Sequence, residues 1–123
     1  MKRNHPRTIF VDLDGCIIKS CNPFTWYEPF VLLDGALEAL RDWWNAGIRI
    51  IIVTGRPECV RCWTASELHR TRVPYHQLVM DVGSGTRYLV NDLKPYAPDE
   101  PTAVAVNITR DRGLVDRNFV RED

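Results

Sequence analysis

The stretch TIFVDLDG at residues 8–15 decides the fold, because a run of β-forming residues leads directly into two carboxylates and a glycine. Strands of a parallel sheet that is covered on both faces are apolar almost throughout, so residues 8–12 predict a buried strand. Residues 48–53 (IRIIIV) have the same character and predict a second, central strand. Gly15 is expected to end the first strand.

Two helices are predicted on either side of the second strand. The first begins near Asp34, a good N-cap, and ends at Gly47, which suits the C′ position. Its apolar face is predicted from residues at helical spacing, namely Leu33, Leu37, Leu40 and Trp44. The second helix takes Pro57 in its first turn and runs to about Arg70.

Three further strands are predicted in the rest of the chain, at residues 76–80, 88–91 and 103–107. The alternation of strands and helices predicts an α/β fold, a Rossmann-like three-layer sandwich with a mostly parallel five-stranded sheet. We expect a single domain over residues 1–123, with its core at about 8–107. A charged tail at 110–123 is expected to be partly disordered.

The composition favours an ordinary globular domain. The chain has 123 residues, 45% of them hydrophobic, with 16 basic and 16 acidic residues, so no net field draws it toward nucleic acid or acidic membranes. A local basic patch is expected only among the arginines of residues 56–72. No apolar run reaches the roughly 20 residues of a membrane span, and no signal sequence is apparent. We therefore predict a cytoplasmic protein, and we expect its cysteines to be free thiols, at Cys16, Cys21, Cys59 and Cys62.

Polar residues follow three of the predicted strands, and the carboxyl ends of parallel strands form the usual site of open α/β sheets. They are Asp12 and Asp14 after the first strand, Thr54, Gly55 and Arg56 after the second, and Asn91, Asp92 and Lys94 after the fourth. Two carboxylates on one side of a strand end repel each other, and Mg²⁺ relieves that repulsion. A hydroxyl and a backbone N–H near a helix start suit a phosphoryl oxygen. Each group alone also fits a solvated turn.

In this order, the three groups resemble motifs of the haloacid dehalogenase-like (HAD) hydrolases, over about residues 8–107. Asp12-Leu13-Asp14-Gly15 resembles motif I, Thr54 motif II and Asn91-Asp92 motif IV. The resemblance implies that Asp12 attacks phosphorus and forms an aspartyl-phosphate, with Asp14 as general acid and then base. It also implies Mg²⁺ as cofactor, held by Asp12, the backbone carbonyl of Asp14, and Asp92.

The resemblance assigns supporting roles as well. Thr54 is expected to bind a phosphoryl oxygen, and Asn91 to support the metal shell. For the phosphate-binding cation of motif III, the candidates are Arg87 and Lys94, with Arg56 behind them. The chain departs from the family in having Cys16 where Thr is common and Asn first in motif IV. The second carboxylate of motif I favours a phosphatase over a dehalogenase.

The space between the motifs holds no cap domain, so the resemblance implies a capless phosphatase with an open site, which a homo-oligomer would close. Residues 83–95 resemble capless HAD proteins of sugar-phosphate pathways, which favours a sugar phosphate or similar small metabolite as substrate. Residues 54–74 also resemble the phosphatase half of polynucleotide kinase-phosphatases, which makes a nucleotide or polynucleotide 3′-phosphate the alternative. A further alternative is a non-catalytic HAD-like binding or regulatory protein.

Two other signals admit more than one interpretation. Trp26 and Tyr27, in the loop at residues 16–33, suit either stacking on a sugar or base or plain packing. Cys59 and Cys62, with two histidines downstream, suit either zinc binding or two thiols on a helix face.

Overall fold

Three parallel strands form the sheet of this computed structural model, which describes residues 5–120. They are β1 (Thr8–Asp12), β2 (Arg49–Val53) and β3 (Gln77–Val79), arranged in the order β1-β2-β3. The register pairs Asp12 with Val53 and Val53 with Val79. The three strands therefore end in line, and the loops that follow them meet at one edge of the sheet.

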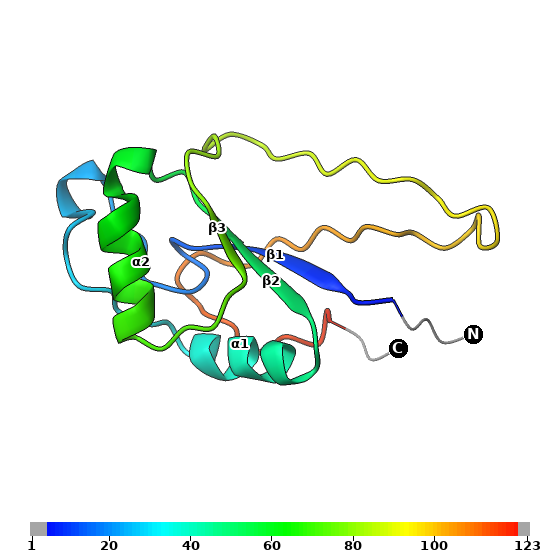
Figure 1. The fold of residues 1–123 in the computed structure, drawn as a ribbon, viewed down its shortest axis with the longest axis horizontal. Coiled ribbons are helices and arrows are strands. Elements are labelled where there is room, and N and C mark those ends of the chain that lie inside the picture. The colour runs from blue at the N-terminus through cyan, green and yellow to red at the C-terminus, as the bar shows by residue number, and fades with distance from the viewer. Residues whose placement is uncertain (1–4, 121–123) are drawn as a thin grey trace.

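Two helices cover one face of this sheet, α1 (Ala36–Asn45) and α2 (Arg61–Arg70). Short 3₁₀ turns, η1 (Pro23–Thr25) and η2 (Glu58–Val60), precede them. Both β-α-β connections advance in the same direction across the sheet, and right-handed crossovers then place both helices on the same side. Figure 1 shows the two helices with the three strands, and Ile50 and Ile52 of β2 are fully buried.

The opposite face of the sheet has no helix among residues 5–120. Phe10, in the middle of β1, is 53% exposed there, and Val79 on β3 is also exposed. The apolar strands predicted two covered faces, but the described residues form two layers rather than three.

Residues 83–107 form an extended arm that leaves the sheet and reaches away from it (Figure 1). The segments 88–91 and 103–107, predicted as the fourth and fifth strands, both lie in this arm and are not strands here. The β-forming character of these segments is real, but a strand requires a partner for its backbone, and neither segment has a sheet neighbour.

Helix α1 differs from the prediction in its N-cap and in most of the residues that it buries. Its N-cap is Gly35, with a φ of 74°, rather than Asp34, and its buried residues are Ala36, Ala39, Leu40 and Trp43. The expected Trp44 is exposed and stacks on His76, with ring centroids 4.3 Å apart. The helix ends as predicted, with Gly47 just beyond its C-cap.

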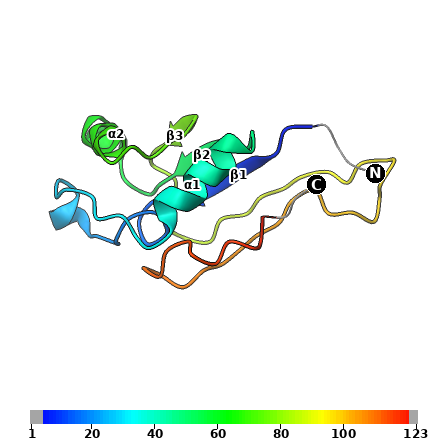
Figure 2. The ribbon, with the colours of Figure 1, turned by 90° about the horizontal axis from the view of Figure 1, so that it is seen from below.

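The segment expected to be a partly disordered tail packs against the core instead, over residues 111–120. Leu114 is buried and donates its backbone N–H to the Asp34 carbonyl, while Phe119 meets the ring of Trp43. Figure 2 shows this segment running beside α1. The core therefore extends past residue 107. Within residues 5–120, no helix is long and apolar enough to cross a membrane.

Candidate active site at the carboxyl edge of the sheet

Asp12 is the last residue of β1, and its carboxylate faces the edge where the strand ends meet. One carboxylate oxygen accepts a hydrogen bond from the backbone N–H of Leu13 at 3.0 Å. The same oxygen lies 3.3 Å from a guanidinium nitrogen of Arg87, at the start of the arm. The Asp12 side chain is 38% exposed, so an accessible carboxylate stands beside an accessible cation.

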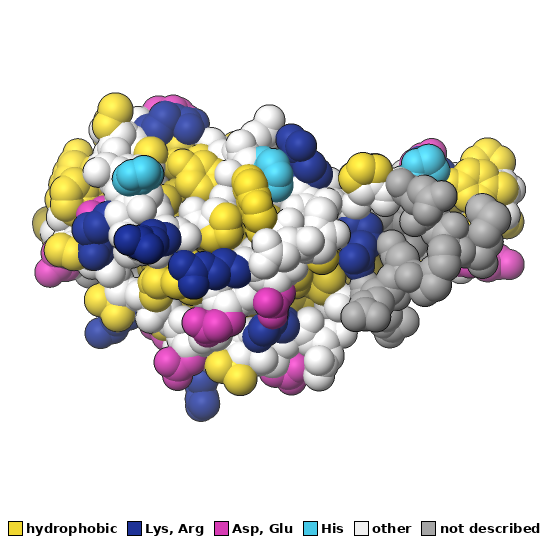
Figure 3. All heavy atoms as spheres, turned by 60° about the horizontal axis from the view of Figure 1, so that its bottom comes forward, with side chains coloured by type: hydrophobic (Ala, Val, Ile, Leu, Met, Phe, Trp, Pro, Cys, Tyr) yellow, Lys and Arg dark blue, Asp and Glu magenta, His cyan; other side chains and the backbone are white. Residues whose placement is uncertain are grey.

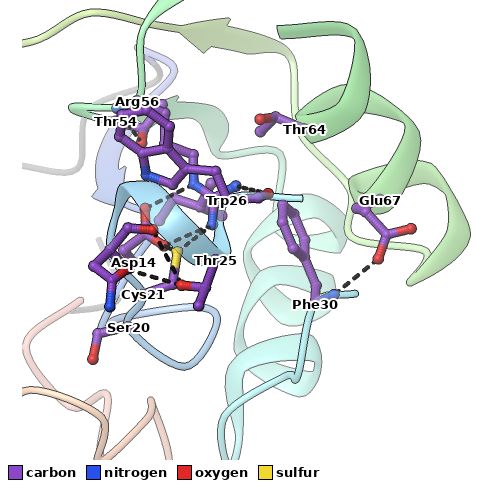
Figure 4. A network of polar contacts seen from close by, with 12 residues as sticks. Asp14, Ser20, Cys21, Thr25, Trp26, Phe30, Thr54, Arg56, Thr64 and Glu67 are labelled. Atoms are coloured by element: carbon purple, nitrogen blue, oxygen red, sulfur yellow. Dashed lines mark hydrogen bonds and ion pairs between the residues drawn. The ribbon is translucent and has the colours of Figure 1, made fainter. Parts of the chain in front are cut away.

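Asp14 lies in a different environment, two residues further along. Arg56 donates a hydrogen bond to each of its carboxylate oxygens, from Nε at 3.0 Å and from Nη2 at 2.9 Å (Figure 4). The Arg56 side chain is only 2% exposed, so this is a buried, bidentate ion pair. Each oxygen of Asp14 therefore accepts a hydrogen bond from Arg56.

Arg56 also ties the loop at residues 16–33 to the sheet. Its Nη1 donates to the backbone carbonyl of Trp26 at 3.0 Å, its Nη2 donates to the Cys21 sulfur, and its guanidinium lies 5.0 Å from the ring centre of Phe30. This differs from the prediction that Arg56 binds phosphate, because the guanidinium is committed to partners within the chain.

Thr54 and Gly55 begin the loop after β2, as predicted, but Thr54 is fully buried. Its hydroxyl oxygen accepts the backbone N–H of Arg56 at 3.1 Å, which shapes the turn. Gly55 lies against the next loop, where an added Cβ would stand 3.2 Å from the Val82 carbonyl oxygen. In this arrangement the Thr54 hydroxyl supports the turn and does not face the exposed edge.

Asn91 and Asp92 lie on the arm, away from the strand ends. The amide of Asn91 donates to Thr102, and Asp92 pairs with Lys94 at 2.8 Å. The hydrogen bond and charge of Lys94 lower the pKa of Asp92. Of the two leading candidates for the phosphate-binding cation, Arg87 therefore contacts Asp12, whereas Lys94 contacts Asp92.

The structure does not bring the expected metal ligands together. Residues 5–120 hold no group of three or more His, Cys, Asp or Glu side chains that could bind a metal ion. Asp12, Asp14 and Asp92 therefore form no such group, and the exposed thiols Cys59 and Cys62 belong to none. All four cysteines are free.

Two cysteines lie near the site, and the sequence assigned neither of them a role there. The Cys21 thiol donates to Asp14 at 3.2 Å, and its partial burial, followed by this hydrogen bond and the charge of Asp14, raises its pKa. Cys16 follows Gly15 in the same loop, and burial, with the nearby Asp12 charge, raises its pKa to about 11. A lone cysteine in a loop carries no sequence signal of this kind, because the contact depends on how the loop returns.

The site combines an accessible carboxylate, Asp12, with an accessible cation, Arg87, at the carboxyl end of β1. A carboxylate can attack an electrophilic phosphorus, and an arginine beside it suits the oxygens of a phosphoryl group. The third feature, the ion pair of Asp14 and Arg56, lies beside them, and Arg56 also contacts the loop at residues 16–33.

No protein-family model matches the chain, and no curated protein matches it either. Solved structures share its fold. A chain from a structure of the Pnkp1/Rnl/Hen1 complex is 21% identical, with a TM-score of 0.57, over 71% of this chain and 32% of its own length. A chain from the Pnkp1/Rnl/Hen1 RNA repair complex is 22% identical, with a TM-score of 0.55, over 67% of this chain and 28% of its own.

A third structure, of an MCSG target from Vibrio cholerae, is 19% identical, with a TM-score of 0.54, over 75% of this chain and 84% of its own length. At these identities the likeness shows the fold alone, an α/β domain with a parallel sheet. The chain spans about a third of the length of the two RNA repair complex chains.

Proposed function

We propose that this protein hydrolyses phosphate monoesters, with Asp12 as the covalent nucleophile. The observation that carries the proposal is the ion pair of Asp12 and Arg87 at the carboxyl edge of the sheet, in which both side chains are accessible. An anionic phosphoryl group placed there would meet the arginine through its oxygens and the carboxylate through its phosphorus.

The chemistry balances in two steps. An Asp12 oxygen forms a bond to phosphorus as the bond from phosphorus to the substrate oxygen breaks, which leaves an aspartyl-phosphate and an alcohol. Water then attacks the same phosphorus, releasing inorganic phosphate and restoring the Asp12 carboxylate. Arg87 neutralises charge on the phosphoryl oxygens in both steps. The alcohol oxygen takes a proton as it leaves, and Asp14 is the proposed donor once it has separated from Arg56 and become protonated. In the second step the Asp14 carboxylate takes a proton from the attacking water, which restores the protonated acid.

A magnesium requirement is part of the proposal, but the residues near Asp12 do not complete a magnesium site. The Asp12 carboxylate and the backbone carbonyl of Asp14 are oxygen ligands of the type that Mg²⁺ prefers. Asp92 would be the third ligand, and it lies on the arm, paired with Lys94. Neither step of the proposed reaction is therefore assigned to a metal ion.

The preferred substrate is a sugar phosphate or similar small metabolite. The arginines of helix α2 do not offer a free basic groove, because Arg61 pairs with Glu58 and Arg70 pairs with Glu67. Figure 3 shows basic and acidic side chains interspersed on the face that it displays. A polynucleotide 3′-phosphate is the second candidate, favoured by the fold likeness to chains of an RNA repair complex.

The proposal places the chain among the capless HAD phosphatases, with the five-stranded sheet of that fold. It is supported by the positions of Asp12 at the end of β1 and Thr54 directly after β2, and by the shared fold of the solved structures. The five-stranded form requires residues 88–91 and 103–107 to pair as strands, which they do not do within residues 5–120. A cytoplasmic location belongs to the same proposal and agrees with the four free thiols.

The test is phosphate release from a panel of sugar phosphates, nucleotides and a 3′-phosphorylated oligonucleotide, with Mg²⁺ or with EDTA. Asp12→Asn should lower the rate at least about 10³-fold, because the nucleophile is lost. Asp116→Asn, the same change at an exposed carboxylate outside the site, should match the wild type. Chelation should abolish activity. Equal activity of Asp12→Asn, or no release from any substrate, would reject the mechanism and favour the binding-protein alternative.

A further inference from the structure

The edge strand β1 lacks a partner on its outer side. It pairs with β2 along one edge, and no other strand pairs with it among residues 5–120. Natural edge strands are normally protected by charges, prolines or bulges, and the sequence TIFVD has no such protection before its terminal aspartate. The exposed ring of Phe10 adds an apolar surface beside this open edge.

The same chain carries unpaired strand-forming segments in its arm. Residues 84–91 and 103–108 neither donate nor accept a backbone–backbone hydrogen bond with any described residue. Their side chains are apolar and exposed, with Tyr88 at 87% and Val90 at 91%, and Val104 and Val106 are exposed on the returning limb. Aromatic and β-branched residues in this pattern suit a sheet, and leaving them in water forgoes their burial.

The arm cannot deliver its polar end to its own site. Arg87 contacts Asp12 at the carboxyl end of β1, so the arm begins there. From that point it runs outward (Figure 1), and Asp92 lies five residues on, about 16 Å of extended chain. To bring Asn91 and Asp92 to the carboxyl edge, residues 88–91 would have to run parallel to β1, which starts them at its other end.

We propose that the arm of one copy adds to β1 of a second copy, and that the exchange is reciprocal about a two-fold axis. In a second copy nothing fixes where residues 88–91 begin, so they can pair in parallel with the outer edge of β1. The exchange gives residues 88–91 backbone partners along β1 and places their side chains beside those of β1, including the exposed ring of Phe10. The formal net charge of zero means that two copies do not repel each other overall.

This exchange places Asn91 and Asp92 of one copy beside Asp12 of the other. The carboxylate missing from the site within one chain is then contributed by the partner copy, and each dimer holds two complete sites. This second part rests on the proposed phosphatase function, whereas the interface itself does not.

The interface is tested by light scattering coupled to size-exclusion chromatography. The wild type should run at twice 14.2 kDa. Val90→Asp should run as a monomer, because a charge would be buried in the new sheet. Val31→Asp, the same change at an exposed valine outside the arm and β1, should remain a dimer. A monomeric wild type at its highest soluble concentration, or equal dimerisation of both variants, would overturn the proposal.

The shared site is tested by co-expressing Asp12→Asn with Asp92→Asn. Exchange gives mixed dimers one intact site, so random pairing should restore about a quarter of wild-type activity from two inactive chains. No restoration in a preparation shown to contain mixed dimers would overturn the shared site. If the wild type releases no phosphate at all, the phosphatase proposal fails, while the scattering result still decides the interface.

Discussion

Replacing Arg56 with methionine tests the buried ion pair that organises the site. Methionine keeps much of the length of the arginine side chain but removes all of its side-chain hydrogen bonds, including both to Asp14. Removing one partner of a buried pair costs about 3–5 kcal/mol, because the other charge is left without compensation. The contact with the Trp26 carbonyl is lost as well.

The loss of stability should be plain in a denaturation experiment. At this chain length the change corresponds to a fall in Tm of about 10–20 °C. We would follow urea and thermal unfolding by tryptophan fluorescence and circular dichroism. Asp14→Asn combined with Arg56→Met should cost much less than the sum of the two single changes, because each single change breaks the same interaction.

Arg61→Met is the matched control, since Arg61 forms an ion pair with Glu58 in which both side chains are substantially exposed. Such pairs contribute little, and the variant also loses the hydrogen bond from Arg61 to the Leu78 carbonyl, so it should be destabilised by only about 1 kcal/mol. If Arg56→Met is as stable as Arg61→Met, or if the double-mutant cycle shows full additivity, the buried pair does not exist as described.

Three further outcomes are expected. The hydrogen bonds from Arg70 are the main cause that lowers the pKa of Glu67. Ionised Glu67 therefore stabilises the fold above its ordinary pKa of 4.5, and this contribution is lost as acid protonates it. The free energy of unfolding, measured from pH 7 to 3, should fall less steeply for Glu67→Gln than for the wild type. Gly113→Ala should destabilise the protein far more than Gly47→Ala in urea titrations, although both glycines have φ near 80°. Only the Cβ at position 113 would clash with the backbone, at the carbonyl oxygen of Asp34. Equal losses of stability would contradict the close packing of Gly113 against Asp34. Cys16, with a pKa near 11, should react with a thiol reagent at pH 8 far more slowly than exposed Cys59.

The sequence predicted the strands of the sheet best where a continuous run of apolar residues marks them. Residues 8–12 form β1 as expected, because a continuous apolar run leaves few alternatives. The face of α1 was harder, since the pattern favoured large residues and the structure buries Ala36 and Ala39, whose small size lets the helix approach the sheet. Trp44 instead reaches the surface beside His76.

The site divides in the same way. The position of Asp12 at the end of β1 follows from the strand pattern, whereas its neighbouring cation was left open between Arg87 and Lys94 until the structure placed Arg87 there. The pairing of Asp14 with Arg56 does not, because the partners lie 42 positions apart and either could have faced solvent. The charge of residues 110–120 likewise concealed Leu114, whose burial depends on a contact with Asp34 that no local pattern reports.

The loop after β1 has a consequence for how the protein folds. The carbonyl of Gly15 accepts the backbone N–H of Asp111, and Ser20 donates to the Asp111 carboxylate across 91 positions of sequence. Closing so long a loop costs entropy before its contacts form, which slows folding. The strands and helices of residues 8–80 can assemble from shorter-range contacts. We therefore expect the loop that carries Asp14 to become ordered late, in the same kinetic step as the docking of residues 111–120 onto α1.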